Sequence, residues 1–285
     1  METALNATFE VLSFGATIVL VVLGLGIIAS MMGIYNFAHG EFVLLGAYTT
    51  YVVYGAGLPV WAGMLVAPVV VAVCGFVLER LVIRRLYAAP IAAMLATYAL
   101  GLMIRESVRG LIGGLYISVP EPIVGSLIIG GVQVSKWRLA IVLITALVMS
   151  ASYLLLARTS FGLRARAALE NPSLARASGI STSAIYAATF TFGAALAGLA
   201  GALVVPLFSL SADLGVRFLI QGFLAVMLGG IGTFEGPVAG GAVIGVMSAA
   251  LPWAVPPVLA DVLVFVIVII FVKFRPAGLI AGRRV

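Results

Sequence analysis

The sequence predicts an all-α fold, a polytopic transmembrane helical bundle of eight or nine spans that forms a single domain over residues 1–285. Of these 285 residues, 63% are hydrophobic and only 9% are charged, whereas soluble domains carry roughly 25% charged residues. Uncharged apolar runs recur along the whole chain, and a helix needs about 20 residues to cross about 30 Å of hydrocarbon. A lipid bilayer is therefore the expected surrounding of most of the chain.

Clusters of basic residues between the apolar runs predict the orientation. Loops rich in Lys and Arg remain in the cytoplasm, which places the acidic N-terminus outside and the C-terminus inside. The net charge of +6 reflects this bias, so it predicts no nucleic-acid partner. The clustered residues are Arg80, Arg84 and Arg85, then Arg158, Arg164, Arg166 and Arg176, and finally Lys273, Arg275, Arg283 and Arg284.

The spans follow from this orientation, and two loops stand out between them. We expect a cytoplasmic loop at 158–183 and an extracellular loop at 113–136, where β-prone residues 116–135 suggest a short hairpin. Lys136 and Arg138 fit the orientation least well. The expected spans are 11–32, 36–54, 60–80, 91–111, 138–157, 184–208, 218–234, 237–253 and 257–274.

Two of these spans are broken or re-entrant. Between Glu41 and Gly55 lie 13 uncharged residues, which as a helix cover only about 20 Å, so this is a half-helix or Asn36–Glu41 enters the membrane. Between Arg217 and Pro252, the segment LGGIGTFEGP leaves two arms, 218–227 and 238–251, each of which we expect to be too short to span. Interrupted segments in two halves of a transporter mark its central pathway.

Each break has two interpretations. Asn36 could cap a helix while His39 and Glu41 sit at the inner interface with partners in adjacent helices, or the three could line the pathway. His39 and Glu41 are two residues apart, so they should not face each other on a helix. At the second break, Thr233 and Glu235 lie among glycines that include Gly230, which fits either a tight turn or the pathway.

A further charged group, Arg105, Glu106 and Arg109, closes the fourth span. Glu106 and Arg109 can pair along one helix face. Snorkelling to the outer interface and a role as a gate both remain open. Elsewhere, Gly193, Ala197 and Gly201 repeat every four residues, which predicts close approach of another helix.

The cytoplasmic loop carries signals for a short helix. Asn171 is a good N-cap, Pro172 fits the first helical position, and Gly179 suits the position just after the helix. Ser181 or Thr182 can then cap the next span. The short helix could be a handle for a partner protein or a solvated connector.

The chain has no catalytic or nucleotide-binding motif, so we expect a transport protein that is not an enzyme and binds no cofactor or metal. A phosphate-binding loop needs Gly-Lys-[Ser/Thr], yet the two lysines, Lys136 and Lys273, follow Ser135 and Val272. No HExxH, GxSxG or clustered His/Cys set is present. Any ATP hydrolysis must come from another chain.

Four blocks of the sequence stand out as a set. They are IYNFAHGEFVLLGAY at 34–48, ENPSLARASGI at 170–180 followed by FGAALAGLAGAL, LGGIGTFEGPVAGGAVIG at 228–245, and FRPAGLIAG at 274–282. Together these blocks resemble the branched-chain amino acid ABC transporter permease family of the LivH type, which includes permeases for urea and other amides. The resemblance runs in register over nearly the whole chain. One departure is Tyr35, where an aliphatic residue is expected.

The resemblance implies an importer in the bacterial inner membrane. Its partners would be a second permease subunit (a related chain or a second copy), two cytoplasmic ATPases that hold ATP and Mg²⁺, and a periplasmic substrate-binding protein. Coupling to an ATPase would fall to Glu170, Asn171, Pro172, Arg176 and Gly179. The substrate pathway would lie near Asn36, His39, Glu41, Gly230, Thr233 and Glu235.

A rival interpretation from another class is a stand-alone channel or secondary transporter for a small polar solute. In that case His39 and Glu41 would belong to a proton or ion relay.

Overall fold

The computed structural model describes residues 2–87, 89–129 and 132–280, and the chain there is mostly helical. Short 3-10 turns at Ile83–Leu86 and Leu251–Trp253 follow α3 and α10, and an antiparallel hairpin pairs β1 (Ser126–Ile129) with β2 (Val132–Ser135). The helices are α1 (Glu2–Met32), α2 (His39–Gly55), α3 (Val60–Leu81), α4 (Pro90–Ile112), α5 (Lys136–Arg158), α6 (Ser160–Glu170), α7 (Pro172–Ala177), α8 (Thr182–Val204), α9 (Leu214–Gly229), α10 (Glu235–Ala250) and α11 (Pro257–Phe274).

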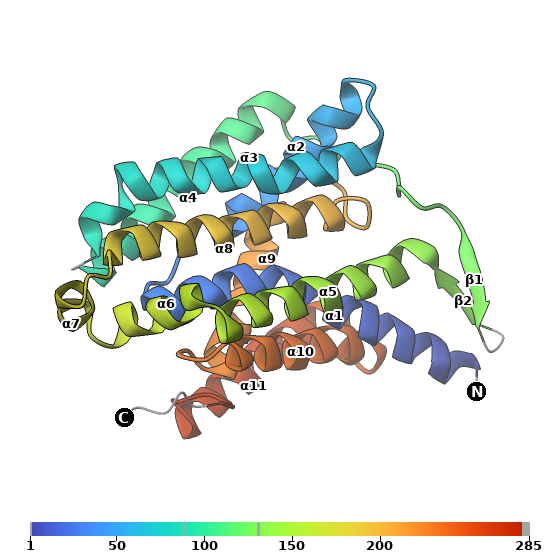
Figure 1. Ribbon diagram of the computed structural model, residues 1–285. Helices are drawn as coiled ribbons and strands as arrows, with labels where there is room; N and C mark the ends of the chain where they lie inside the picture. The colour runs from blue at the N-terminus through green and yellow to red at the C-terminus, as the bar shows by residue number, and fades with distance from the viewer. Residues whose placement is uncertain (1, 88, 130–131, 281–285) are drawn as a thin grey trace.

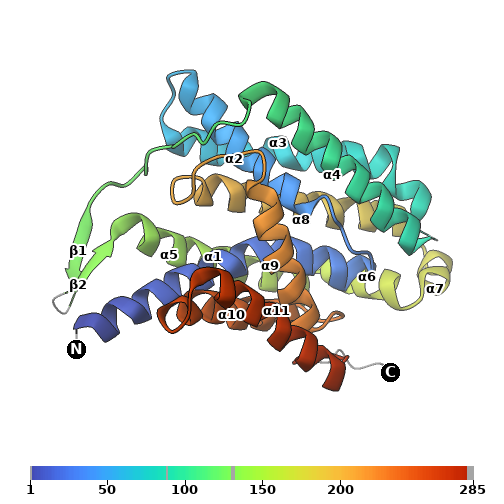
Figure 2. The same cartoon turned by 180° about the vertical axis from the view of Figure 1, so that it is seen from behind.

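The long helices form two groups whose axes run roughly side by side (Figure 1). One group holds α2, α3, α4 and α8, and the other holds α1, α5, α10 and α11. Helix α9 runs steeply across the others and contacts α2 in one group and α10 in the other (Figure 2). Helices α1 and α8 join the two groups along the middle of the bundle.

Small residues allow the central helices to approach closely. A Cβ atom on Gly193 would meet Ile28 and the carbonyl oxygen of Gly24 in α1, and one on Gly201 would strike the backbone of α2 at Val43. Helix α8 is mostly buried, because it contacts α1, α2 and α3. The predicted close approach at the four-residue repeat is therefore confirmed.

The bundle has two distinct ends. The N-terminus and the β1–β2 hairpin lie at one end, which we call the hairpin end, and α6, α7 and the C-terminal segment lie at the other, the α7 end (Figures 1 and 2). The elements that carry the three basic clusters meet at the α7 end; for example, Arg84 after α3 donates to Ser183 at the start of α8 over 3.4 Å. This grouping is the one that the charge pattern predicted for the described residues; Arg283 and Arg284 of the last cluster lie outside them.

Within the part of the chain that the structure describes, seven helices are long and apolar enough to cross a membrane, while α2 and α9, with 17 and 16 residues, are shorter. The expected span at 218–234 is wrong in its bounds, because α9 begins at Leu214 and ends at Gly229. The expectation that the arm 238–251 is too short is also wrong. Its helix starts already at Glu235 and continues through a 3-10 turn to Trp253, which gives 19 residues.

The structure adds detail to the two loops that were predicted at 113–136 and 158–183. The hairpin falls within the predicted extracellular loop, and the preceding strand-like segment pairs with the α8–α9 connection, where Ile117 and Leu210 exchange backbone hydrogen bonds of 2.9 and 2.8 Å. The loop expected at 158–183 contains a second helix, α6, that the sequence did not suggest.

Candidate functional site

The first break places a set of buried polar residues deep in the bundle; we call Asn36, His39, Glu41, Thr97 and Arg105 the entry cluster. After α1 the chain turns at Gly33, whose φ is +67°, and returns into the bundle before α2 begins. The Nε2 atom of His39 lies 2.9 Å from the carbonyl oxygen of Val21, which is near the middle of the span Ala7–Met32. Helix α2, with 17 residues, therefore starts well inside the bundle. Placement at the inner interface is wrong.

Polar contacts hold the segment before α2 in place. Asn36 does not cap the helix, because Ala38 occupies the N-cap position; instead, the Asn36 Oδ1 atom accepts a hydrogen bond of 3.0 Å from the Ala38 amide. The Phe37 amide donates to Thr97 Oγ1 of α4 over 3.1 Å. Unwound backbone at membrane depth needs such partners, because lipid offers none.

A buried ion pair links α2 to α4. Arg105 donates to Glu41 Oε1 through Nη2 and through Nε, the latter at 3.0 Å. The side chain of Glu41 is 1% exposed and that of Arg105 is 17% exposed, so snorkelling of Arg105 to the outer interface is wrong. Arg109 behaves differently, since it lies at the hairpin end of α4 and pairs with exposed Glu106 (3.1 Å, as predicted) and Asp213 (2.7 Å).

Several polar atoms of this region have no partner among the residues that the structure describes. His39 and Glu41 do not pair with each other, as predicted from their spacing. Polar groups buried within a membrane bundle are costly and typically mark a solute or ion pathway. The atoms are Asn36 Nδ2, His39 Nδ1, Glu41 Oε2 and Gln221 Oε1 of the neighbouring helix α9.

The second break is a tight turn between α9 and α10. Gly230 and Gly232 have φ of +90° and +97°, a region that L side chains rarely adopt. Thr233 Oγ1 accepts a hydrogen bond of 3.1 Å from the Gly236 amide, and Glu235 is exposed. The C-terminal segment covers this turn, because the Ile280 amide donates to Gly229 over 3.0 Å. The neighbours of this turn are therefore the C-terminal segment and the start of α10, not the entry cluster; this applies to Gly230, Thr233 and Glu235.

The short helix α7 lies at the far tip of the α7 end (Figure 1). Asn171 Oδ1 caps it by accepting from the Leu174 amide over 2.9 Å, Pro172 occupies its first turn, and Gly179 follows it with φ of +81°. The predicted boundaries are therefore confirmed. Glu170, Asn171, Arg176 and Gly179 are exposed, and Leu174, an apolar residue, is 63% exposed.

A second buried carboxylate lies near the α7 end. Glu79 of α3 accepts a hydrogen bond from the hydroxyl of Tyr87, which follows the 3-10 turn. Burial, together with this hydrogen bond, raises the pKa of the Tyr87 phenol, so the hydroxyl stays protonated and remains a donor. The contact ties the α3–α4 connection to α3.

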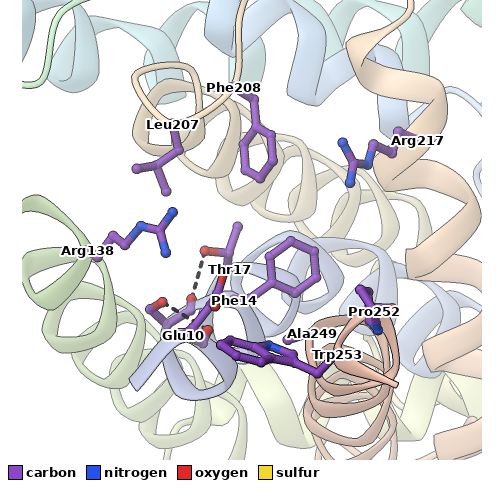
Figure 3. Close-up of a pocket in the computed structure, with 12 residues that line it drawn as sticks. Glu10, Phe14, Thr17, Arg138, Leu207, Phe208, Arg217, Ala249, Pro252 and Trp253 are labelled. Carbon is purple, nitrogen blue, oxygen red and sulfur yellow. Dashed lines mark hydrogen bonds between the residues drawn. The ribbon is translucent and has the colours of Figure 1, made fainter. Parts of the chain in front are cut away.

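A cavity of about 610 Å³ lies at the hairpin end; we call it the outer cavity (Figure 3). Three charged side chains line it, Glu10 from α1, Arg138 from α5 and Arg217 from α9. Ser13, Phe14, Thr17, Leu207, Phe208, Ser248, Ala249, Pro252 and Trp253 complete the lining.

Sequence reasoning missed two parts of this arrangement. The pairing of Glu41 with Arg105 was not foreseen, although both are charged residues beside apolar runs, a signal that could have joined them. The outer cavity was also missed. One trace of it was Arg138, which fitted the charge pattern poorly because it lies in the first turn of α5, and α5 begins at the hairpin end, away from the basic clusters.

Known proteins that are similar to this chain include several described as permeases of branched-chain amino acid transport. The high-affinity branched-chain amino acid transport system permease protein LivH of Salmonella typhimurium is 26% identical over 99% of this chain and 96% of its own length. BraD of Pseudomonas aeruginosa, described in the same words, is 27% identical over 96% and 94%. A probable LivH of Methanocaldococcus jannaschii is 29% identical over 83% and 77%.

A family model described as "Branched-chain amino acid transport system / permease component" matches residues 7–272. The match includes every membrane-spanning candidate apart from the last two residues of α11. Apolar helices of spanning length and permease relatives together indicate a multi-pass membrane protein. The chain belongs to the family of branched-chain amino acid transport system permeases.

Proposed function

We propose that this chain is the membrane-spanning permease subunit of an ABC importer in the bacterial inner membrane, and that it translocates branched-chain amino acids or related small amino acids and amides such as urea. The observation that carries the proposal is the match of the permease family over residues 7–272. The LivH and BraD relatives are described as permeases of high-affinity branched-chain amino acid transport systems.

The energy for transport comes from other subunits. The chain carries no phosphate-binding loop in its sequence, so two cytoplasmic ATPases supply ATP hydrolysis with Mg²⁺, and this chain binds no cofactor. A second permease subunit, either a related chain or a second copy, completes the membrane part. A periplasmic binding protein delivers the substrate at the hairpin end.

The coupling site is α7 with its flanking residues Glu170, Asn171, Pro172, Arg176 and Gly179. A capped helix with an exposed leucine at the tip of the bundle is suited to insert into a groove of an ATPase. ATP binding would then move α7, and the permease pair would alternate between outward and inward openings.

The substrate pathway runs past the entry cluster. Asn36 lies where the chain is unwound inside the bundle, and His39 and Glu41 lie in the first turn of α2 that follows, the arrangement from which transporter sites are built. Gly230, Thr233 and Glu235 belong to the exit on the cytoplasmic side, beside the C-terminal segment.

The test is reconstitution with candidate ATPase and binding-protein subunits from the same genome. In proteoliposomes, L-leucine accumulation should require ATP and the binding protein, and the purified chain should retain the ATPase subunits. Uptake without ATP, by the chain alone, would overturn the proposal.

A second candidate function is a stand-alone channel or secondary transporter for a small polar solute. The observation that favours it is the burial of His39 and Glu41 at the depth of the middle of α1, because ionisable residues at that depth occur in proton relays. This candidate predicts ATP-independent flux that depends on a proton or ion gradient.

A further inference from the structure

The outer cavity has the size and position of a binding site. Its volume of about 610 Å³ falls within the range of roughly 300 to 1,000 Å³ of small-molecule sites. Side chains from α1, α5, α9, α10 and the α8–α9 connection line it, so several elements fix its shape. It lies at the hairpin end, which the charge pattern predicts to be outside, the side from which an importer receives its substrate.

Two arginines are aimed into the cavity from opposite sides (Figure 3). Neither Arg138 nor Arg217 forms an ion pair with any residue that the structure describes, in contrast to Arg105 and Arg109, whose guanidinium groups are occupied by carboxylates. The guanidinium carbon of Arg217 lies 5.4 Å from the centre of the Phe208 ring, which orients it. Guanidinium groups bind carboxylates with charge-assisted hydrogen bonds.

The remaining lining complements the other parts of an amino acid. Glu10 supplies a single carboxylate at the α1 side of the cavity, suited to an ammonium group. Phe14, Leu207 and Trp253 offer apolar contacts to an aliphatic side chain. The cavity therefore combines cationic, anionic and apolar groups, whereas urea or another neutral amide would leave both arginines without an anion.

We propose that the outer cavity is the site at which the permease receives an α-amino acid zwitterion, with Arg138 and Arg217 on the α-carboxylate, Glu10 on the ammonium and the apolar residues on the side chain. This inference rests on the proposed function and deepens it, because it selects aliphatic amino acids over neutral amides.

Transport by the reconstituted importer gives the first test. Replacing both arginines (Arg138→Gln with Arg217→Gln) should raise the KM for L-leucine by about tenfold or more, since a hydrogen bond to a charged group contributes roughly 1.5–3 kcal/mol. Lys136→Gln is the matched control, because it removes a positive charge at the same end of α5 outside the cavity. An unchanged KM in the double variant would overturn the site.

Conservative variants separate recognition from folding. Arg138→Lys keeps the charge but loses the planar pair of donors, so its KM should lie between those of the wild type and Arg138→Gln. Both Arg138 variants should keep the unfolding temperature of the wild-type chain, which separates a loss of recognition from a loss of folding. A KM of Arg138→Lys equal to that of Arg138→Gln would contradict the role assigned to the positive charge at position 138.

Direct binding to the purified chain gives a test that does not need transport. Trp253 lines the cavity, so L-leucine should change tryptophan fluorescence saturably, and Trp253→Phe should abolish the change. L-leucinamide, which lacks the carboxylate, and 4-methylpentanoate, which lacks the ammonium, should each bind at least about tenfold more weakly. Equal responses to all three compounds, or none to L-leucine, would overturn the site.

The two tests fail in distinguishable ways. If the wild-type importer does not carry L-leucine with ATP, the proposed function is wrong, and the fluorescence titration still decides the site. If the importer carries L-leucine and the arginine variants behave as Lys136→Gln does, the function stands and the outer cavity is not its receiving site.

Discussion

Glu41 and Arg105 form the most demanding contact at the scale of single residues. A charge inside a membrane bundle is costly, and two such charges are tolerated together because each supplies the partner that lipid cannot. The second carboxylate oxygen of Glu41 has no partner among the described residues. The pair therefore holds α4 to the start of α2 while leaving one acceptor free on the proposed pathway.

Breaking this pair from one side should be more harmful than removing it entirely. Arg105→Gln leaves a buried carboxylate alone and should lower the free energy of unfolding by about 3–5 kcal/mol. The double variant Glu41→Gln with Arg105→Gln leaves no buried charge and should lose less stability than Arg105→Gln alone. Thermal unfolding of the purified chain in lipid nanodiscs measures this.

Glu106→Gln serves as the control for that comparison. Glu106 is 60% exposed and pairs with Arg109 at the surface, so its loss should change stability little. If Arg105→Gln unfolds at the same temperature as Glu106→Gln, the buried pair does not support the fold as described.

The residue scale also shows what the sequence could predict. His39 and Glu41 were recognised as polar residues at a break, and Glu106–Arg109 as a helix pair, because both inferences need only local spacing. The partner of Glu41 lies 64 residues away. That contact depends on how far the chain re-enters the bundle after α1, which no local pattern records.

At the scale of elements, α7 could be predicted from local sequence signals, whereas α6 could not. Helix α7 follows from its own residues, with a cap, a proline and a terminal glycine in order. Helix α6 was missed because tertiary packing places it. Gly162 lies directly against the backbone of Leu156 at the end of α5, and Arg166 donates to the same carbonyl over 2.8 Å.

Helix α7 should be the point of contact with an ATPase. Leu174→Asp places a charge in the proposed interface and should reduce substrate-stimulated ATP hydrolysis by roughly tenfold or more, the effect of losing an interface anchor. Leu163→Asp on α6 is the matched control, because both leucines are 63% exposed. ATPase rates of reconstituted complexes give the comparison.

Charged residues around Leu174 extend this prediction. Glu170→Ala or Arg176→Ala should uncouple ATP hydrolysis from substrate and binding protein while the complex still assembles. Normal coupling in both variants and in Leu174→Asp would show that α7 is a connector only.

The contact between α2 and α8 should tolerate no added methyl group. A Cβ atom on Gly46 would meet the backbone of Gly198, so Gly46→Ala must push the helices apart and should cost about 1–3 kcal/mol. Gly55→Ala, in the same helix, meets nothing within 4 Å. It should leave stability unchanged or slightly raised, because alanine favours helix. Equal unfolding temperatures for the two variants would contradict the packing.

The whole molecule combines two helix groups with a steep helix, α9, that touches both (Figure 2). Composition and charge predicted a membrane bundle and which basic segments share an end. They did not predict the tilt of α9, since its start is set by a contact between Gly215 and Gly40 of α2. Bounds of broken helices depend on such contacts, which explains the errors at 218–234 and 238–251.

The orientation of the bundle in the membrane is a prediction about the whole molecule. The positive-inside rule places the α7 end in the cytoplasm and the hairpin end outside. Cysteines introduced at exposed Gln133 in β2 and exposed Ser173 in α7, in a chain whose single cysteine is replaced (Cys74→Ser), report the two ends. In intact cells, a membrane-impermeant maleimide should label Gln133→Cys and spare Ser173→Cys. Inverted membrane vesicles should give the opposite result. Labelling of Ser173→Cys in intact cells would show that the predicted orientation is wrong. The assignments of α7 to the ATPases and of the outer cavity to incoming substrate would then be wrong as well.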